Sequence, residues 1–208
     1  HIFILKNRDV RNCINIWVFE NFTMPQINHK GQNILFLSDT HGKHRLLEIA
    51  ENIDVVIHCG DICNDGDMSD ISDFFEWYSA LEIPNKIFVY GNHDFPFEFE
   101  PDLSRDLVPS NVRWLNDESV IINEISILAI SAFPKHIHLN RNENLDIIIS
   151  HYSPYGILDD GYGIEEIRDF VLQQKPLYHV FGHNHSSPGA LLTENTQFIN
   201  ASNFNELS

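Results

Sequence analysis

Residues 34–41 read Ile-Leu-Phe-Leu-Ser-Asp-Thr-His, a run of apolar residues followed at once by polar residues that can bind a metal ion. An apolar run of this length is typical of a buried strand. The polar residues then fall where the carboxyl end of that strand emerges, and open α/β sheets place their binding sites at such ends. This stretch therefore predicts a buried strand with a site at its end.

The same pattern recurs four more times along the chain. Apolar runs at 55–57, 87–90 and 147–149, and a weaker run at 179–181, lead into segments rich in His, Asp and Asn. These segments read Gly60-Asp61, Gly91-Asn92-His93-Asp94, Ser150-His151 and Gly182-His183-Asn184-His185. Strand and helix signals alternate along the first half of this region, which predicts an α/β fold with mostly parallel strands and helices on both faces.

Helices are expected where apolar residues recur at helical spacing. One such set predicts a helix that ends before Pro84, and its members are Ile71, Phe74, Phe75, Tyr78 and Leu81. Residues 46–50 predict a short amphipathic helix, which would leave His44 exposed to solvent near its start. A later helix is expected from Ile164 to Leu172.

The middle and the end of the chain differ from this alternation. Strand candidates at 112–115, 119–122 and 125–130 follow one another closely and predict a hairpin or an added antiparallel layer. Residues 191–192 and 198–199 predict a final hairpin. Residues 1–32 carry no catalytic signal, and we expect an N-terminal extension there, with an edge strand at 14–19 as one option. Residues 33–208 are expected to form the functional domain.

Composition limits the partners that this chain can have. The formal net charge is -17, from 13 basic and 30 acidic residues. Proteins that bind long nucleic acids gain affinity from clustered Lys and Arg, so this balance argues against such a partner but allows a small anionic substrate held by metals. No apolar stretch is long enough to cross a membrane. Three cysteines without a disulfide framework suit a reducing cytosol, so we expect a cytoplasmic protein of undecided oligomeric state.

The polar segments together supply the donors that two adjacent divalent cations require. Such a pair needs oxygen and imidazole ligands from several directions, with one carboxylate able to bridge. The candidate donors are Asp39, His41, Asp61, Asn92, His151, His183 and His185. His183 and His185 are two residues apart, as are Asp39 and His41, and in extended backbone that spacing directs both side chains to one face. Gly60, Gly91 and Gly182 each precede a donor, where the backbone must turn sharply and approach its neighbours closely.

The order Asp-x-His, Gly-Asp, Gly-Asn-His-Asp, a lone His and Gly-His-x-His resembles the calcineurin-like metallophosphoesterase superfamily. The resemblance runs from about Asn33 to Ser202. Finer matches at 38–44, 91–98, 154–159, 179–183 and 198–202 look like the branch of small metallophosphoesterase-domain proteins with cyclic-nucleotide phosphodiesterase activity. The resemblance implies a metallophosphoesterase fold, in which mostly parallel or mixed sheets pack as a sandwich flanked by helices.

The resemblance also implies how the donors divide between two metal ions. Asp39, His41, Asp61 and His185 would hold one ion. Asp61, Asn92, His151 and His183 would hold the other, with Asp61 bridging. Mn²⁺ is the ion expected to support activity in vitro, and Fe, Zn²⁺ or Co²⁺ also suit mixed nitrogen and oxygen ligands.

A mechanism follows from the same resemblance. A water that bridges the metals would attack phosphorus in line with the leaving oxygen. His93 would act as general acid or as a hydrogen-bond donor to the transition state, and Asp94 would orient its imidazole. Lys43, Tyr152 and Tyr155 are candidates for contact with the substrate.

We expect a metal-dependent phosphodiesterase that acts on a small ester, of nucleotide or cyclic-nucleotide type. A nuclease or a phosphomonoesterase, including a protein phosphatase, is the alternative among enzymes. A weakly catalytic module that binds nucleotides is an alternative from a different class. The sequence does not decide the natural substrate or the native metal.

Overall fold

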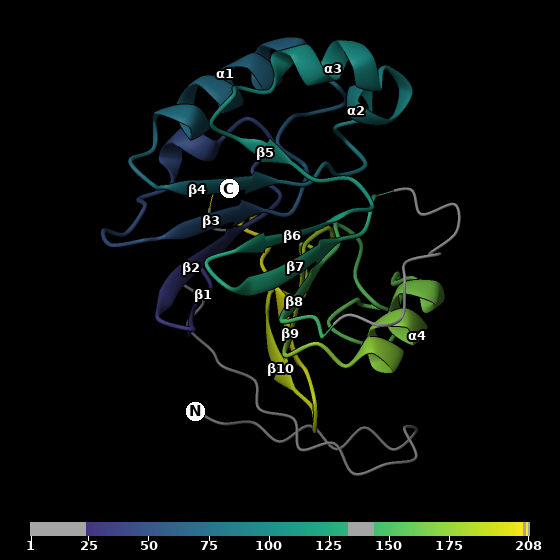
Figure 1. Cartoon of the computed structure of the whole chain (residues 1–208). Helices are drawn as coiled ribbons and strands as arrows, with labels where there is room; N and C mark the ends of the chain where they lie inside the picture. The colour runs from purple at the N-terminus through teal and green to yellow at the C-terminus, as the bar shows by residue number, and fades with distance from the viewer. Residues whose placement is uncertain (1–23, 133–143, 206, 208) are drawn as a thin grey trace.

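Two mixed β-sheets pack face to face in the computed structural model, which describes residues 24–132, 144–205 and 207. The first sheet has the order β1-β2-β3-β4-β5 and the second the order β10-β11-β9-β8-β7-β6. Figure 1 shows α1, α2 and α3 together over the outer side of the first sheet, with α4 beside the second. The predicted fold class, a sandwich of mixed sheets flanked by helices, is confirmed.

The first sheet is built from four parallel strands and one antiparallel edge strand. Its strands are β1 (Gln26–His29), β2 (Gln32–Leu37), β3 (Val55–His58), β4 (Asn85–Phe88) and β5 (Arg113–Trp114). The expected strand at 112–115 thus pairs with β4 here and takes no part in the hairpin that follows it. The edge strand suggested at 14–19 lies outside the described residues.

The second sheet has a parallel centre with an antiparallel hairpin at each end. Its strands are β6 (Ser119–Ile122), β7 (Ile125–Ala129), β8 (Ile147–Ile149), β9 (Tyr178–Phe181), β10 (Gly189–Leu192) and β11 (Gln197–Asn200). The hairpins β6–β7 and β10–β11 confirm the two antiparallel predictions.

The helices are α1 (Met68–Ala80), α2 (Pro96–Phe99), α3 (Pro101–Leu107) and α4 (Glu165–Gln174). Asp67 caps α1 by accepting the backbone N–H of Ser69 and Asp70, which otherwise lack partners at a helix start. Tyr78 ties α1 to the first sheet, because its hydroxyl donates to the backbone oxygens of Val56 and Ile87. The predicted helices at 71–81 and 164–172 are confirmed.

Side chains along each strand point alternately to the two faces of its sheet, and this divides the core into three layers. Ile34 and Ile57 face the second sheet, where Ile127 and Ile149 meet them. The other face of the first sheet packs against α1, and the other face of the second packs against α4. Central parallel strands are covered on both faces, which is why their sequences are continuously apolar.

Two expectations near residue 44 are wrong. The short helix predicted at 46–50 is only a 3₁₀ turn over His44–Leu46. A helix of so few residues is hard to nucleate, and Leu47 and Ile49 instead pack against the core beneath α1. His44 is fully buried, not exposed, because its ring packs on Phe74 and its Nε2 lies 3.0 Å from Asp73.

Within the described residues, no helix combines the length and the apolar content that a membrane crossing requires.

Asp146 joins the two sheets at the end away from the polar segments. Its carboxylate accepts hydrogen bonds from Lys30 at 2.8 Å and from the backbone N–H of Ser126 at 2.8 Å, and it lies 2.8 Å from His29 Nε2. Burial acts to raise the pKa of Asp146, but the hydrogen bonds from Lys30, Ser126 and His29 outweigh it, so the pKa is lowered. The charged carboxylate therefore stabilises the folded state.

We predict that Asp146→Asn lowers the free energy of unfolding at pH 7 by about 1–3 kcal/mol, because the buried side chain loses its charge and one of the two oxygens that accept from His29, Lys30 and Ser126. A group with a lowered pKa stabilises above its ordinary pKa, and that stability is lost as pH falls through the lowered value. The difference between the two proteins should therefore shrink on acidification below about pH 4. Urea unfolding at several pH values tests this, and equal stability at pH 7 would contradict it.

Candidate functional site

The polar segments meet where the carboxyl ends of parallel strands from both sheets come together. Ser38 follows β2 and Ser202 follows β11, and the two form a parallel β-bridge that joins the sheets at this point. Gly182, after β9, lies so close that a Cβ there would be 1.9 Å from Ser38 Oγ. The site therefore lies on the seam between the two sheets.

One group of four side chains gathers around Asp39. The ligand atoms of Asp39, His41, Asp61 and His185 all lie within 4.8 Å of one another. His185 Nε2 is 3.4 Å from Asp39 Oδ1, and His41 Nε2 is 3.7 Å from Asp61 Oδ2. Two carboxylates and two imidazoles at this spacing fit a divalent cation.

A second group shares Asp61 with the first. The ligand atoms of Asp61, His151 and His183 also lie within 4.8 Å of one another. His151 Nε2 is 3.4 Å from Asp61 Oδ2 and 3.0 Å from Asn92 Oδ1, while His183 Nδ1 is 2.9 Å from the same Asn92 oxygen. All seven sequence-predicted donors thus converge, in two groups that match the division that the family resemblance implied.

Backbone carbonyls orient two of the histidines. His41 Nδ1 lies 3.2 Å from the oxygen of Cys63, and His151 Nδ1 lies 2.9 Å from the oxygen of Cys59. A proton on Nδ1 leaves the lone pair on Nε2, which faces the carboxylates, as in many metal sites. His41 Nε2 is buried and has no hydrogen-bond partner among the described residues. An orphaned lone pair beside two carboxylates fits a cation.

Burial and mutual contact determine the charges in the cluster. Burial opposes ionisation of Asp39 and Asp61, but His185 and His151 respectively outweigh it, so the pKa of each carboxyl is lowered. Burial lowers the pKa of His183 to about 4, which keeps that imidazole neutral at pH 7. His151 is also buried, yet Asp61 raises its pKa to about 9. A cation that binds His151 must therefore displace a proton.

The backbone at Asp39, His41 and His183 is not extended, contrary to the expectation from their two-residue spacing, and adopts an uncommon conformation. Asp39, His41, Asp61 and His183 have φ values of 57°, 43°, 59° and 66°, in the left-handed region that side chains other than glycine rarely occupy. Each such residue costs of order 1 kcal/mol or more, and strain of this kind gathers at functional sites. The surrounding loops hold these residues in place, which directs their side chains to a common point.

Asp94 makes contacts that differ from those expected. Its fully buried carboxylate accepts the backbone N–H of Asp61 at 2.8 Å, of Ile62 at 2.9 Å and of Gly91 at 2.9 Å. It therefore links the loops after β3 and β4 and does not orient the His93 ring. The expectation is wrong because residues adjacent in sequence point in different directions when the loop turns.

His93 stands at the rim of the cluster, with 37% of its side chain exposed. Its ring lies 5.0 Å from that of His41, and its Nδ1 is 3.0 Å from Asp65 Oδ1. The side chain of Asp65 is 89% exposed, and this residue lies outside the set of predicted site residues. Only the nearby run of acidic residues could have drawn attention to it.

The three candidates for substrate contact occupy different surroundings. The ring of Tyr152 lies 4.3 Å from that of His183, beside the cluster. Lys43 is exposed and donates from Nζ to the backbone oxygen of Leu207 at 3.0 Å. Tyr155 instead has the guanidinium of Arg168, in α4, 5.4 Å above its ring. Tyr152 is thus the candidate that lies in contact with the metal-ligand candidates.

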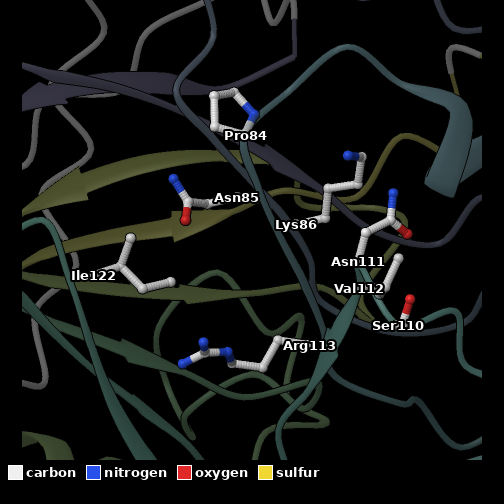
Figure 2. Close-up of a pocket in the computed structure, with 8 residues that line it drawn as sticks. All are labelled: Pro84, Asn85, Lys86, Ser110, Asn111, Val112, Arg113 and Ile122. Carbon is white, nitrogen blue, oxygen red and sulfur yellow. The ribbon is translucent and has the colours of Figure 1, made fainter.

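Two surface hollows differ in their relation to the cluster. One of about 240 Å³ borders it and is lined by Tyr162, His183, Asn184, His185 and Ser186. The other, of about 220 Å³, includes Asn85 and Arg113 at the amino ends of β4 and β5 (Figure 2). Figure 2 shows the cationic ends of Lys86 and Arg113 directed to different sides, so they do not converge on one ligand. We therefore place the functional site at the first hollow.

Comparison with known protein sequences identifies a matching family and several relatives. The profile of a family described as calcineurin-like phosphoesterase matches residues 32–187. A UPF0046 protein of Caenorhabditis elegans is 28% identical, over 83% of this chain and 70% of that protein. Human metallophosphoesterase domain-containing protein 1 is also 28% identical, over 80% of this chain and 64% of the human protein. This chain therefore spans just under two thirds of its human relative.

Solved structures show the same fold at low sequence identity. The crystal structure of TT1561 of Thermus thermophilus superposes with a TM-score of 0.61 at 15% identity. The match covers 80% of this chain and 87% of that one. The arrangement of two sheets and flanking helices is thus shared by sequences that have diverged widely.

We predict that Gly91→Ala displaces the Asp61 carboxylate, because a Cβ at position 91 would lie 2.1 Å from Asp61 Oδ1. If Asp61 serves both groups, Mn²⁺ affinity measured by calorimetry should fall by roughly 10–100-fold or more. Gly31→Ala is the control: its φ of 76° adds a backbone penalty that Gly91→Ala does not have, but nothing lies within 4 Å of its added Cβ, so Mn²⁺ affinity should stay unchanged. Unchanged Mn²⁺ affinity in Gly91→Ala would argue against a ligand role for Asp61.

Proposed function

The chain belongs to the calcineurin-like phosphoesterase family and is a phosphoester hydrolase, and we propose that its substrate is a small phosphodiester of nucleotide or cyclic-nucleotide type. The observation that carries this proposal is the Asp61 carboxylate, which belongs to both groups of converging donors. A shared carboxylate is what a pair of adjacent divalent cations requires.

Two metal ions are proposed to bind at these groups. Asp39, His41, Asp61 and His185 would hold one ion, and Asp61, Asn92, His151 and His183 the other. Two bound cations would acidify a water molecule and neutralise charge on the phosphoryl oxygens. Mn²⁺ is expected to support activity in vitro, while Fe, Zn²⁺ and Co²⁺ suit the same donor set.

His93 is the residue best placed to transfer a proton to the leaving group. Its Nδ1 contacts Asp65, which leaves Nε2 as the nitrogen that can face a substrate. The ring lies next to His41 but is partly open to solvent, so a substrate can reach it. A proton donated from Nε2 to the leaving oxygen would offset the negative charge that develops there.

The surroundings favour a small substrate. The hollow beside His183 and His185 measures about 240 Å³, which suits a compact organic group. Tyr152 offers a ring next to His183, on which a flat group can pack. The net charge of -17 disfavours a long phosphate backbone, which would need basic residues along its path. These features support a small ester over a nucleic acid.

A substrate assay tests the proposed function directly. Manganese-loaded protein should hydrolyse bis-p-nitrophenyl phosphate and a cyclic nucleotide faster than p-nitrophenyl phosphate. A preference for p-nitrophenyl phosphate would favour a phosphomonoesterase or protein phosphatase. Cleavage of long nucleic acid in preference to small esters would favour a nuclease. Metal-dependent nucleotide binding without turnover would favour a binding module and contradict the proposal.

We predict that His93→Ala keeps wild-type Mn²⁺ affinity but lowers kcat by about 10²–10⁴-fold, because a proton donor is lost. Asp65→Asn should lower kcat by no more than about fivefold, since an exposed ion pair contributes about 1 kcal/mol or less. Asp102→Asn, an exposed change on α3, is the control and should leave kcat unchanged. Steady-state kinetics decide, and an unchanged kcat in His93→Ala would remove His93 from the mechanism.

A further inference from the structure

Phe204 packs on two of the metal-ligand candidates from outside the motifs that predicted the site. Its ring is stacked on that of His185, with centroids 4.1 Å apart and planes 15° apart. It also meets the His41 ring edge to face at 5.4 Å. We propose that Phe204 is a positioning residue that holds the His185 imidazole in the orientation a metal ion needs. This inference rests on the proposed metal site.

His185 needs such support more than His41 or His151 does. His41 and His151 each have a backbone carbonyl at Nδ1 that fixes the ring. In the described part of the chain, the one polar contact of the His185 ring is with Asp39, at 3.4 Å. Its side chain is 30% exposed, against 5% for His41 and none for His151. A flat ring stacked on the imidazole limits the rotation that this single contact with Asp39 leaves open.

The backbone next to Phe204 is fixed to the seam between the sheets. Asn203 donates its backbone N–H to the oxygen of Ser38 at 3.0 Å, and its side-chain oxygen accepts the N–H of Ser38 at 3.3 Å. Asn203 is fully buried. Since Ser38 directly precedes Asp39, this pair of hydrogen bonds sets Phe204 at a fixed distance from the metal-ligand candidates.

Two further contacts secure the segment on the other side of Phe204. Asn205 donates from its side chain to the backbone oxygen of His185. Lys43 donates to the backbone oxygen of Leu207 at 3.0 Å, and its Nζ lies 5.7 Å from the centre of the Phe204 ring. The segment 203–205 therefore contacts His185 through both its ring and its backbone. Residues that orient metal ligands commonly change metal affinity 10–100-fold when altered.

A purely structural role for Phe204 predicts a different result from a positioning role. If the ring only covers apolar surface, leucine should replace it with little effect on the metals. If the flat face orients His185, replacement by leucine should weaken metal binding, whereas replacement by tryptophan should preserve it. Comparing Phe204→Leu with Phe204→Trp therefore separates the two roles, and both variants keep a large apolar side chain in the fold.

The experiment titrates the metal-free full chain with Mn²⁺ and follows free Mn²⁺ by electron paramagnetic resonance. We expect Phe204→Leu to weaken one of two Mn²⁺ sites by about 10-fold or more while the other keeps its affinity. Phe204→Trp should retain both affinities. Phe99→Leu is the matched control, because Phe99 on α2 is 73% exposed, and it should match the wild type. Circular dichroism confirms that each variant is folded.

A second readout needs no metal. Protons of an imidazole stacked on a phenyl face resonate upfield, so the His185 ring signals of metal-free protein should move downfield in Phe204→Leu. Equal Mn²⁺ affinities in wild type and Phe204→Leu would overturn the inference while leaving the proposed function intact. Wild-type protein that binds no Mn²⁺ would overturn the proposed metal site, and the inference with it.

Discussion

The position of the Asp61 carboxylate is the constraint on which the rest of the site depends. Asp61 is almost fully buried, has a left-handed backbone and belongs to both groups of donors. One of its oxygens accepts the backbone N–H of His93 at 2.9 Å, and the other faces His41 and His151. A buried carboxylate of this kind is costly unless opposite charge or hydrogen bonds compensate it. The surrounding histidines, and any cations they hold, provide that compensation.

A second buried carboxylate, that of Asp94, holds the loops around Asp61 in register. It accepts backbone N–H groups from the loop after β3 and from the loop after β4. Burial and the nearby Asp61 carboxylate raise the pKa of Asp94 to about 7, although the N–H donors favour its charged form. Gly91 allows the two loops to approach, because any side chain there would collide with Asp61. Residues next to the ligands thus hold the ligand-bearing loops in place.

Much of this arrangement could be predicted because it depends on local patterns. Apolar runs predict strands, and parallel strands align their carboxyl ends, so polar residues that follow them must gather at one edge. The helix predicted at 46–50 failed because a segment so short takes its conformation from the core beneath it. His44 proved buried for a related reason, since α1 packs over it. In both cases, contacts with residues far away in the sequence outweighed the local sequence pattern on which the prediction was based.

The sequence by itself determined the order of the motifs and the donor types, and the family resemblance that they carry implied the division of the donors into two sets. Only the tertiary structure decided which residues support them. Asp65 contacts His93 and Phe204 stacks on His185, yet neither belongs to the motifs. Asp94, within a motif, holds backbone N–H groups instead of the neighbouring imidazole. The kinds of metal-binding side chain can be read from a short motif, because the motif contains those residues. The residues that orient them depend on the directions of side chains, which are set by loop turns and by segments far apart in the chain.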